Sequence, residues 1–286
     1  MTTLAENLER LEEAIAVACR SAGRPRAEVE LMAVSKTCPA ATIAEAAALG
    51  LTLFGENRVQ EFAAKAEELA LLRQQTAEKL SFVSGHDFSR AENAAISTRA
   101  LAPEVCSAQD VISIAPIPAT GPIRVHLIGH LQSNKALRAA ELFDAVDSVD
   151  SLRLAERLNE AAGKLGKRLP ILIEVKLSPE ETKAGLDPES AEAAQLLERL
   201  PDLAHLETRG LMTIAPFDVP EDVTRACFRS LRRWRDQWAT AHPKLALDVL
   251  SMGMSGDYPL AIAEGATRIR VGTALFGVRK PYSEPA

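Results

Sequence analysis

Eight short apolar runs alternate with helical patterns along most of this 286-residue chain. Each run is nearly continuous in apolar residues, which is typical of parallel strands that are covered by helices. Strands that alternate with helices in this way predict an α/β fold, a (β/α)8 barrel of the TIM type. We expect the strands at residues 29–35, 51–54, 123–128, 145–149, 171–177, 209–214, 246–251 and 268–271.

The first helix is expected over residues 3–21, ahead of the first strand. Thr3 followed by Glu6 forms a capping-box pattern, and apolar residues then recur at helical spacing. A doubly wound open sheet is the alternative fold, but no Gly-x-Gly-x-x-Gly motif follows the first strand. The other helices are expected at 40–49, 57–70, 133–142, 151–163, 188–199, 221–240 and 257–264.

One segment, at about residues 71–122, interrupts this alternation. It is far longer than the usual helix-to-strand loop of about 2–6 residues and contains several prolines. We interpret it as an insertion with some structure of its own within a single domain, residues 1–286. Because such a connection lies at the N-terminal face of a barrel, we expect it to affect stability or assembly more than chemistry. His86 and Cys106 lie inside it, and we assign them no role.

Composition excludes several classes of function. The formal net charge of −6 argues against nucleic acid or an anionic membrane as the main partner. Neither a signal peptide nor an apolar run long enough to span a bilayer is visible. The cysteines are far apart and lack zinc-ligand spacing, so we expect no metal and a cytoplasmic protein with reduced thiols. They are Cys19, Cys38, Cys106 and Cys227.

Lys36 lies at the C-terminal end of the first predicted strand, where barrel enzymes place their sites. A desolvated lysine, or one beside another cation, can lose its proton and attack an aldehyde. For a single lysine, the better interpretation is a solvated side chain just beyond a strand. The other strand ends change that balance.

The loops after the last two predicted strands are rich in Gly, Ser and Thr. Small residues let backbone N–H groups approach an anion, and barrels often bind phosphate with these two loops. The glycines could serve only tight turns, but two such loops on adjacent strands favour a phosphate cup. Arg270 alternates with apolar neighbours; it points either into the barrel, where its charge needs a partner, or to the surface.

Other polar residues at the strand ends remain open to two interpretations. Asn57 either hydrogen-bonds a ligand or caps the following helix. Lys135 either binds an anion or is an ordinary exposed residue of a first helical turn. His130 fits a structural hydrogen-bonding residue better than a catalyst.

Together, these segments resemble the YggS/PROSC family of pyridoxal 5′-phosphate (PLP) homeostasis proteins. The resemblance covers nearly the whole chain except about 71–122, with several long motifs in the same order. The motifs are Ala33-Val34-Ser35-Lys36-Thr37, Gly55-Glu56-Asn57-Arg58-Val59-Gln60-Glu61, His126-Leu127-Ile128-Gly129-His130-Leu131-Gln132-Ser133-Asn134-Lys135, Leu250-Ser251-Met252-Gly253-Met254-Ser255-Gly256-Asp257 and Arg270-Val271-Gly272-Thr273-Ala274-Leu275-Phe276-Gly277.

The resemblance implies the barrel of the alanine racemase N-terminal domain, with PLP at the strand ends. Lys36 would carry the cofactor as an aldimine, and Arg270 would face the pyridine nitrogen. The phosphate would be held by Ser255, Gly272 and Thr273. Asn57 would line the pocket.

Two features depart from the family pattern. The insertion at about 71–122 is unusual for the family. Cys38 stands where bacterial members often have a second lysine, which puts any role of that lysine in PLP transfer in doubt here.

We expect a protein that buffers PLP or delivers it to apo-enzymes, with no catalytic residues and no substantial turnover. An arginine at the pyridine nitrogen disfavours ring protonation and weakens PLP as an electron sink. The chain is also expected to lack the β-domain that gives resembling racemases their second base and their dimer contact, so we expect a monomer. The alternatives are an amino-acid racemase with Tyr258, Cys38 or a water as second base, and a Schiff-base enzyme acting on a sugar phosphate.

Overall fold

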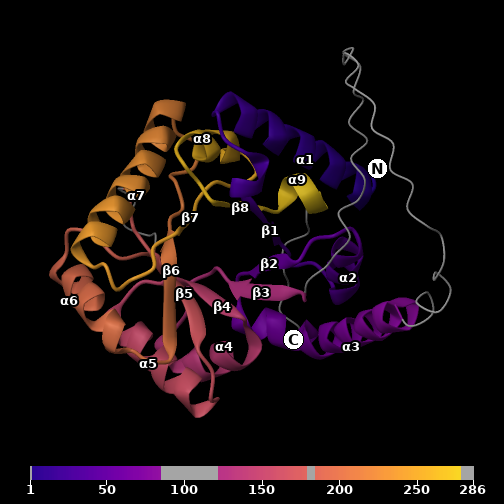
Figure 1. The fold of residues 1–286 in the computed structure, drawn as a ribbon, viewed down its shortest axis with the longest axis horizontal. Helices are drawn as coiled ribbons and strands as arrows, with labels where there is room; N and C mark the ends of the chain where they lie inside the picture. Colours follow the sequence, from indigo (N-terminus) through magenta and orange to yellow (C-terminus); the bar gives the residue numbers. More distant parts are fainter. Residues whose placement is uncertain (1, 85–121, 179–183, 278–286) are drawn as a thin grey trace, which may run out of the picture.

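The strands form a closed parallel barrel in the computed structural model, which describes residues 2–84, 122–178 and 184–277 (Figure 1). Each strand pairs with the next along the chain, and the last pairs with the first, with Met32 opposite Arg270. This closure confirms the predicted barrel and rules out the open sheet. The strands are β1 (Glu30–Val34), β2 (Leu53–Glu56), β3 (Arg124–Leu127), β4 (Ala145–Val149), β5 (Leu169–Glu174), β6 (Leu206–Met212), β7 (Val249–Ser251) and β8 (Arg268–Val271).

Helices surround the barrel, and the main apolar core lies between the two layers (Figure 1). Phe54, Leu127 and Phe228 are fully buried members of this core. Short 3-10 helices occur at Arg26–Glu28, Ser133–Lys135 and Leu200–Asp202. The α-helices are α1 (Leu4–Ser21), α2 (Ala40–Ala48), α3 (Val59–Ser84), α4 (Ala136–Leu142), α5 (Leu152–Lys164), α6 (Ala191–Arg199), α7 (Glu221–Ala241), α8 (Tyr258–Ala263) and α9 (Thr273–Phe276).

The N-terminal helix α1 begins as predicted. Thr3 and Glu6 form a reciprocal capping box, which satisfies two backbone N–H groups at the start of the helix. The buried face of α1 includes Ile15 and Cys19. The helix packs against α8 and α9, and the Asn7 side chain donates to the Leu275 carbonyl at 3.0 Å.

The structure differs from the predicted elements in several places, among them α3, β5 and α9. Helix α3 continues to Ser84 instead of ending at residue 70, because the first part of the predicted insertion is rich in good helix formers and has no glycine or proline before Gly85. Residues 85–121 of that segment lie outside the described residues. Strand β5 ends at Glu174, not at residue 177, and helix α9 was not predicted at all.

Charged side chains form ion pairs inside the barrel near its N-terminal end. The Arg268 guanidinium lies 2.8 Å from a Glu30 oxygen and 3.2 Å from an Asp147 oxygen. His126 Nδ1 lies 3.0 Å from the other Asp147 oxygen. Burial opposes ionisation of Asp147, but His126 and Arg268 outweigh it and lower the pKa of Asp147. His126, Asp147 and Arg268 also border a cavity of about 220 Å³ at this end.

The described part of the chain can be compared with the features of membrane-spanning and metal-binding proteins. None of the helices in the described part of the chain has the length and apolar character needed to cross a membrane. Within the same ranges, no three His, Cys, Asp or Glu residues are arranged to hold a metal ion.

Candidate cofactor site

Lys36 lies in a turn just beyond the C-terminal end of β1, and its side chain is exposed. Met32 and Val34 belong to the apolar cluster inside the barrel, whereas Ala33 belongs to the core that faces the helices. β1 ends at Val34, and Lys36 follows in a turn where Thr37 adopts a φ of 63°, in the left-handed region. Lys36 therefore lies at the C-terminal end of the barrel.

A buried ion-pair network supports this turn from α3. Lys65 Nζ lies 2.8 Å from Glu56 and 3.7 Å from Glu61, and it donates to the Ser35 and Cys38 carbonyls that flank Lys36. The Ser35 hydroxyl donates to Glu56 at 2.6 Å. Burial raises the pKa of Glu56, and the Lys65 ammonium opposes that rise. None of these contacts was predicted from the sequence, although the Gly55–Glu61 motif contains both carboxylates.

The Thr37 backbone is held by the same network. Its N–H donates to the Glu61 carboxylate, so the left-handed residue is fixed from outside the strand. Such a conformation is uncommon for a β-branched residue and persists where surrounding contacts hold it.

Arg270 points into the barrel. The sequence had left open whether this side chain points inward or to the surface. Its side chain is 4% exposed and donates to the Ser251 carbonyl at 2.7 Å, to the Ser251 hydroxyl at 2.9 Å and to the Thr213 carbonyl at 2.8 Å. Burial lowers the pKa of Arg270, while Asp147, Glu174 and Asp257 oppose that effect. These contacts use three of the five N–H donors of a guanidinium, and the others remain for a ligand.

The two loops predicted to form a phosphate cup meet beyond the ends of β7 and β8. The Ser255 hydroxyl accepts hydrogen bonds from the Gly272 N–H at 3.4 Å and from the Ala274 N–H at 3.3 Å. Thr273 is exposed at the start of α9. Gly253 adopts a φ of 93°, and a side chain there would collide with Ala261. Backbone N–H groups that converge beside a hydroxyl suit an anion such as phosphate.

Asn57 borders a cavity of about 240 Å³ at the mouth of the barrel. The Arg58 carbonyl accepts the first hydrogen bond of α3, so Arg58 precedes the helix and the capping interpretation of Asn57 is wrong. Gly129 lies beside it, and a Cβ there would stand 2.2 Å from the Asn57 carbonyl oxygen. The close approach of these two loops therefore requires glycine. The cavity is lined by Asn57, Gly129, His130, Glu174, Val175, Lys176, Leu177, Ser178, Ala184 and Ile214.

Glu174, at the C-terminal end of β5, is the site residue that sequence analysis missed. Its neighbours Ile173 and Val175 belong to the helix-facing core, so Glu174 points into the barrel. Its side chain is 4% exposed, and Oε2 has no hydrogen-bond partner among the described residues. Burial, followed by the Asp150 charge, raises the pKa of Glu174 to about 7 against the influence of Arg270. A single acidic residue inside an apolar strand run was the available signal.

His130 and Lys135 line a neighbouring cavity of about 430 Å³ that also borders Asn57. His130 Nδ1 lies 3.2 Å from an Asp150 oxygen, and the structural interpretation of this histidine stays a prediction. The location of Lys135 leaves open the choice between an anion contact and an ordinary exposed residue.

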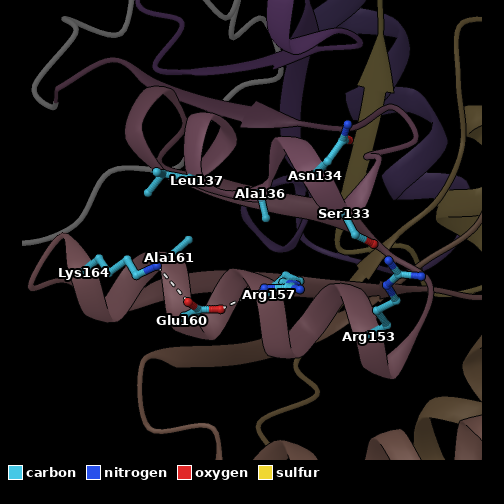
Figure 2. Close-up of a pocket in the computed structure, with 9 residues that line it drawn as sticks. All are labelled: Ser133, Asn134, Ala136, Leu137, Arg153, Arg157, Glu160, Ala161 and Lys164. Carbon is cyan, nitrogen blue, oxygen red and sulfur yellow. Dashed lines mark hydrogen bonds and ion pairs between the residues drawn. The ribbon is translucent and has the colours of Figure 1, made fainter.

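The structure does not bring every residue of the third motif to the barrel mouth. Figure 2 shows that Ser133 and Asn134 instead border a separate pocket of about 230 Å³ together with residues of α5. Across that pocket, Glu160 pairs with Arg157 at 3.2 Å and with Lys164 at 2.8 Å. These are exposed ion pairs of a helix surface.

Comparisons with known proteins identify relatives over the full chain. Residues 7–280 match the alanine racemase N-terminal domain family. The pyridoxal phosphate homeostasis protein of Pseudomonas aeruginosa is 37% identical, with both chains covered completely. The protein of the same name from Escherichia coli is 34% identical over 98% of each chain.

A solved structure also matches closely. PipY of Synechococcus elongatus, solved with PLP bound, is 39% identical with a TM-score of 0.70, over 96% of this chain and all of that one. The residues of this chain fit such a ligand in two respects: Arg270 has guanidinium donors beyond its contacts with Ser251 and Thr213, and Glu174 Oε2 has no partner among the described residues.

Proposed function

Because the chain belongs to the alanine racemase N-terminal domain family, we propose that it binds PLP and buffers or delivers it without substantial catalytic turnover. Relatives that match over their full length are named PLP homeostasis proteins, and PipY binds PLP. The observation that carries the proposal is the pairing of a fixed, buried guanidinium at Arg270 with the anion cup at Ser255 and Gly272. This is a binding site for an anionic ring.

Lys36 is proposed as the covalent attachment point. When bound, PLP supplies an aldehyde that a lysine amine can hold reversibly. The turn beyond β1 presents an exposed Lys36 side chain, and Lys65 fixes the carbonyls on both sides of it. An exposed attachment point lets an incoming amine or water reach the bond. A carrier requires this access, whereas an enzyme that excludes water from its site does not provide it.

Arg270 supports binding more than catalysis. A carboxylate beside a pyridine nitrogen would stabilise the protonated ring, whereas a guanidinium disfavours protonation. Arg270 is held by Ser251 and Thr213, so it cannot turn away to relieve this effect. Its proposed role is to orient the ring while leaving it a weak electron sink.

A racemase would need a second base at the barrel mouth, and the candidate tyrosine gives no support for one. Tyr258 is buried and lines a groove with residues of α1, such as Val17. The Cys38 carbonyl is engaged by Lys65, and the Cys38 side chain is buried. In the described part of the chain, Cys19, Cys38 and Cys227 form no disulfide, in keeping with the proposed cytoplasmic location, where apo-enzymes would receive PLP.

The proposed function is tested by loading and transfer. Purified protein is saturated with PLP, freed of excess ligand and mixed with an apo form of a PLP-dependent enzyme. We expect retained PLP and reactivation of the acceptor, with no exchange of the Cα proton of D- or L-amino acids by the carrier alone. Failure to retain PLP would reject the proposal, and rapid Cα exchange would establish the racemase alternative. A colourless protein that still bonds to sugar-phosphate aldehydes would favour the third function.

A further inference from the structure

Glu174 presents a feature that the roles of Lys36, Arg270 and the phosphate cup leave unused. Its carboxyl group is buried at the end of β5, and Oε2 has no hydrogen-bond partner among the described residues. A buried polar atom without a partner destabilises the folded protein, because it has lost its hydrogen bonds to water. Such an atom is best explained by a partner that the protein itself does not provide.

The unpartnered oxygen belongs to a residue that lines the cavity of about 240 Å³ at the barrel mouth and whose charge interacts with that of Arg270. Glu174 shares this cavity with Asn57, which the family motif places in the cofactor pocket. The interior direction of Glu174 follows from the strand alternation, since both neighbours along β5 face the helices. A ligand at the barrel mouth therefore meets the Glu174 carboxyl group.

The charges around Glu174 favour a protonated carboxyl group. Asp150, beyond the end of β4, raises its pKa, whereas Arg270 on β8 lowers it. His130 and Lys176 line the same cavity, and His130 pairs with Asp150 instead of with Glu174. No ion pair within 4.0 Å joins Glu174 to a basic side chain in the described ranges. With desolvation as the main cause, the pKa of about 7 leaves the proton in place at mildly acidic pH.

We propose that Glu174 is a ligand-binding residue that donates a hydrogen bond from its protonated carboxyl group to the anionic ring ligand of this cavity, so that binding retains or takes up a proton. This inference rests on the proposed function for the identity of the ligand. An anion beside Glu174 favours the neutral carboxyl form, as two carboxylates that share a site do. Binding should therefore weaken as the pH rises through the pKa of free Glu174.

The test uses pyridoxine 5′-phosphate, an alcohol that cannot bond covalently to a lysine. Its dissociation constant is measured by calorimetry from pH 6.5 to 8.5, in two buffers of different ionisation enthalpy. We expect the dissociation constant of the wild-type protein to rise more steeply with pH than that of Glu174→Gln. The extra rise has a limit of roughly tenfold per pH unit, which corresponds to one linked proton. The carboxamide keeps a hydrogen-bond donor but holds no titrating proton. The phosphate of the probe titrates equally in both proteins.

Two further variants sharpen the result. Asp150→Asn removes the charge that raises the pKa of Glu174, so the pH at which binding begins to weaken should fall. Glu207→Gln changes a half-exposed carboxyl group near the start of β6, at the opposite end of the barrel, and should bind as the wild type does.

Equal pH dependence in the wild type and Glu174→Gln would overturn the inference while leaving the proposed function intact. If Glu174→Gln does not fold, an unchanged profile for Asp150→Asn would overturn it instead. A wild-type protein that binds neither this probe nor PLP would reject the proposed function and the inference together.

Discussion

Arg270 combines a structural and a ligand-binding role in one buried side chain. Its guanidinium satisfies the Ser251 and Thr213 carbonyls and compensates the interior carboxylate of Asp147. Removing a buried charge that others depend on typically costs about 3–5 kcal/mol. We therefore expect Arg270→Met to lower the free energy of unfolding by an amount of this order and to abolish PLP retention.

Urea denaturation and a filter-binding assay measure these two effects. The matched control is Arg157→Met on the exposed face of α5, which should change neither the unfolding midpoint nor retention appreciably. An Arg270→Met protein that is as stable as the wild type would contradict the assigned contacts.

Ser255 contributes to the cup through its hydroxyl. It accepts two backbone N–H groups from the loop after β8, and each such hydrogen bond is worth about 1 kcal/mol net. We expect Ser255→Ala to weaken PLP binding by roughly tenfold or more and to lower the free energy of unfolding by at most about 2 kcal/mol, the value of the two lost hydrogen bonds. Titration of the apoprotein with PLP checks this. Unaltered affinity would place the phosphate elsewhere.

Between elements, the contact of α3 with the end of β1 decides how Lys36 is presented. Lys65 from α3 neutralises Glu56 and Glu61 and holds the carbonyls that flank Lys36. We expect Lys65→Met to cost about 3–5 kcal/mol in the free energy of unfolding, since it leaves two buried carboxylates without a cation. It should also slow the bonding of PLP to Lys36 by loosening the turn.

The pH dependence of this variant has a definite sign. Burial already raises the pKa of Glu56 in the folded state, and loss of Lys65 removes an opposing influence. A carboxyl group with a raised folded-state pKa destabilises the protein as the pH rises above its unfolded value. The stability deficit of Lys65→Met should thus be larger at pH 8 than at pH 5, whereas Lys164→Met on α5 should show no such trend. A deficit that is independent of pH would contradict the buried network.

The elements were predictable to the extent that local pattern determines them. The eight apolar runs and the capping box of α1 have strong local signals, and the structure bears them out. Glu174 was missed because a strand run alone does not show which residue faces a cavity, and Lys65 because the turn it supports is 30 residues away along the chain. The helical continuation to Ser84 was missed because length was taken as the sign of an insertion.

For the whole molecule, the two ends of the barrel differ in chemistry. Arg268, Glu30, Asp147 and His126 form a paired layer near the N-terminal end, whereas the C-terminal end has the unpartnered Glu174. Because the pKa of Glu174 is raised from 4.5 to about 7, the folded protein holds a proton that the unfolded chain releases. This group therefore lowers stability as the pH rises from about 4.5 to about 7.

Glu174→Gln removes that contribution. We expect the stability of Glu174→Gln relative to the wild type, both free of ligand, to increase between pH 5 and pH 8 in urea unfolding. Carboxylates with lowered pKa values, such as Asp147, increase stability as the pH rises. Their contribution is the same in both proteins and therefore cancels in the comparison. A constant difference across this range would show that Glu174 titrates normally.

The central claim, that Lys36 holds PLP at the mouth of the barrel, is tested most directly by reductive trapping. Wild-type protein and Lys36→Ala are incubated with PLP, treated with borohydride, digested and mapped by mass spectrometry. The account predicts a visible absorbance band that is lost on reduction and a phosphopyridoxyl group on the peptide containing Lys36, with neither in Lys36→Ala. A wild-type protein that remains colourless, or a trapped group on another lysine with Lys36→Ala unaffected, would contradict it.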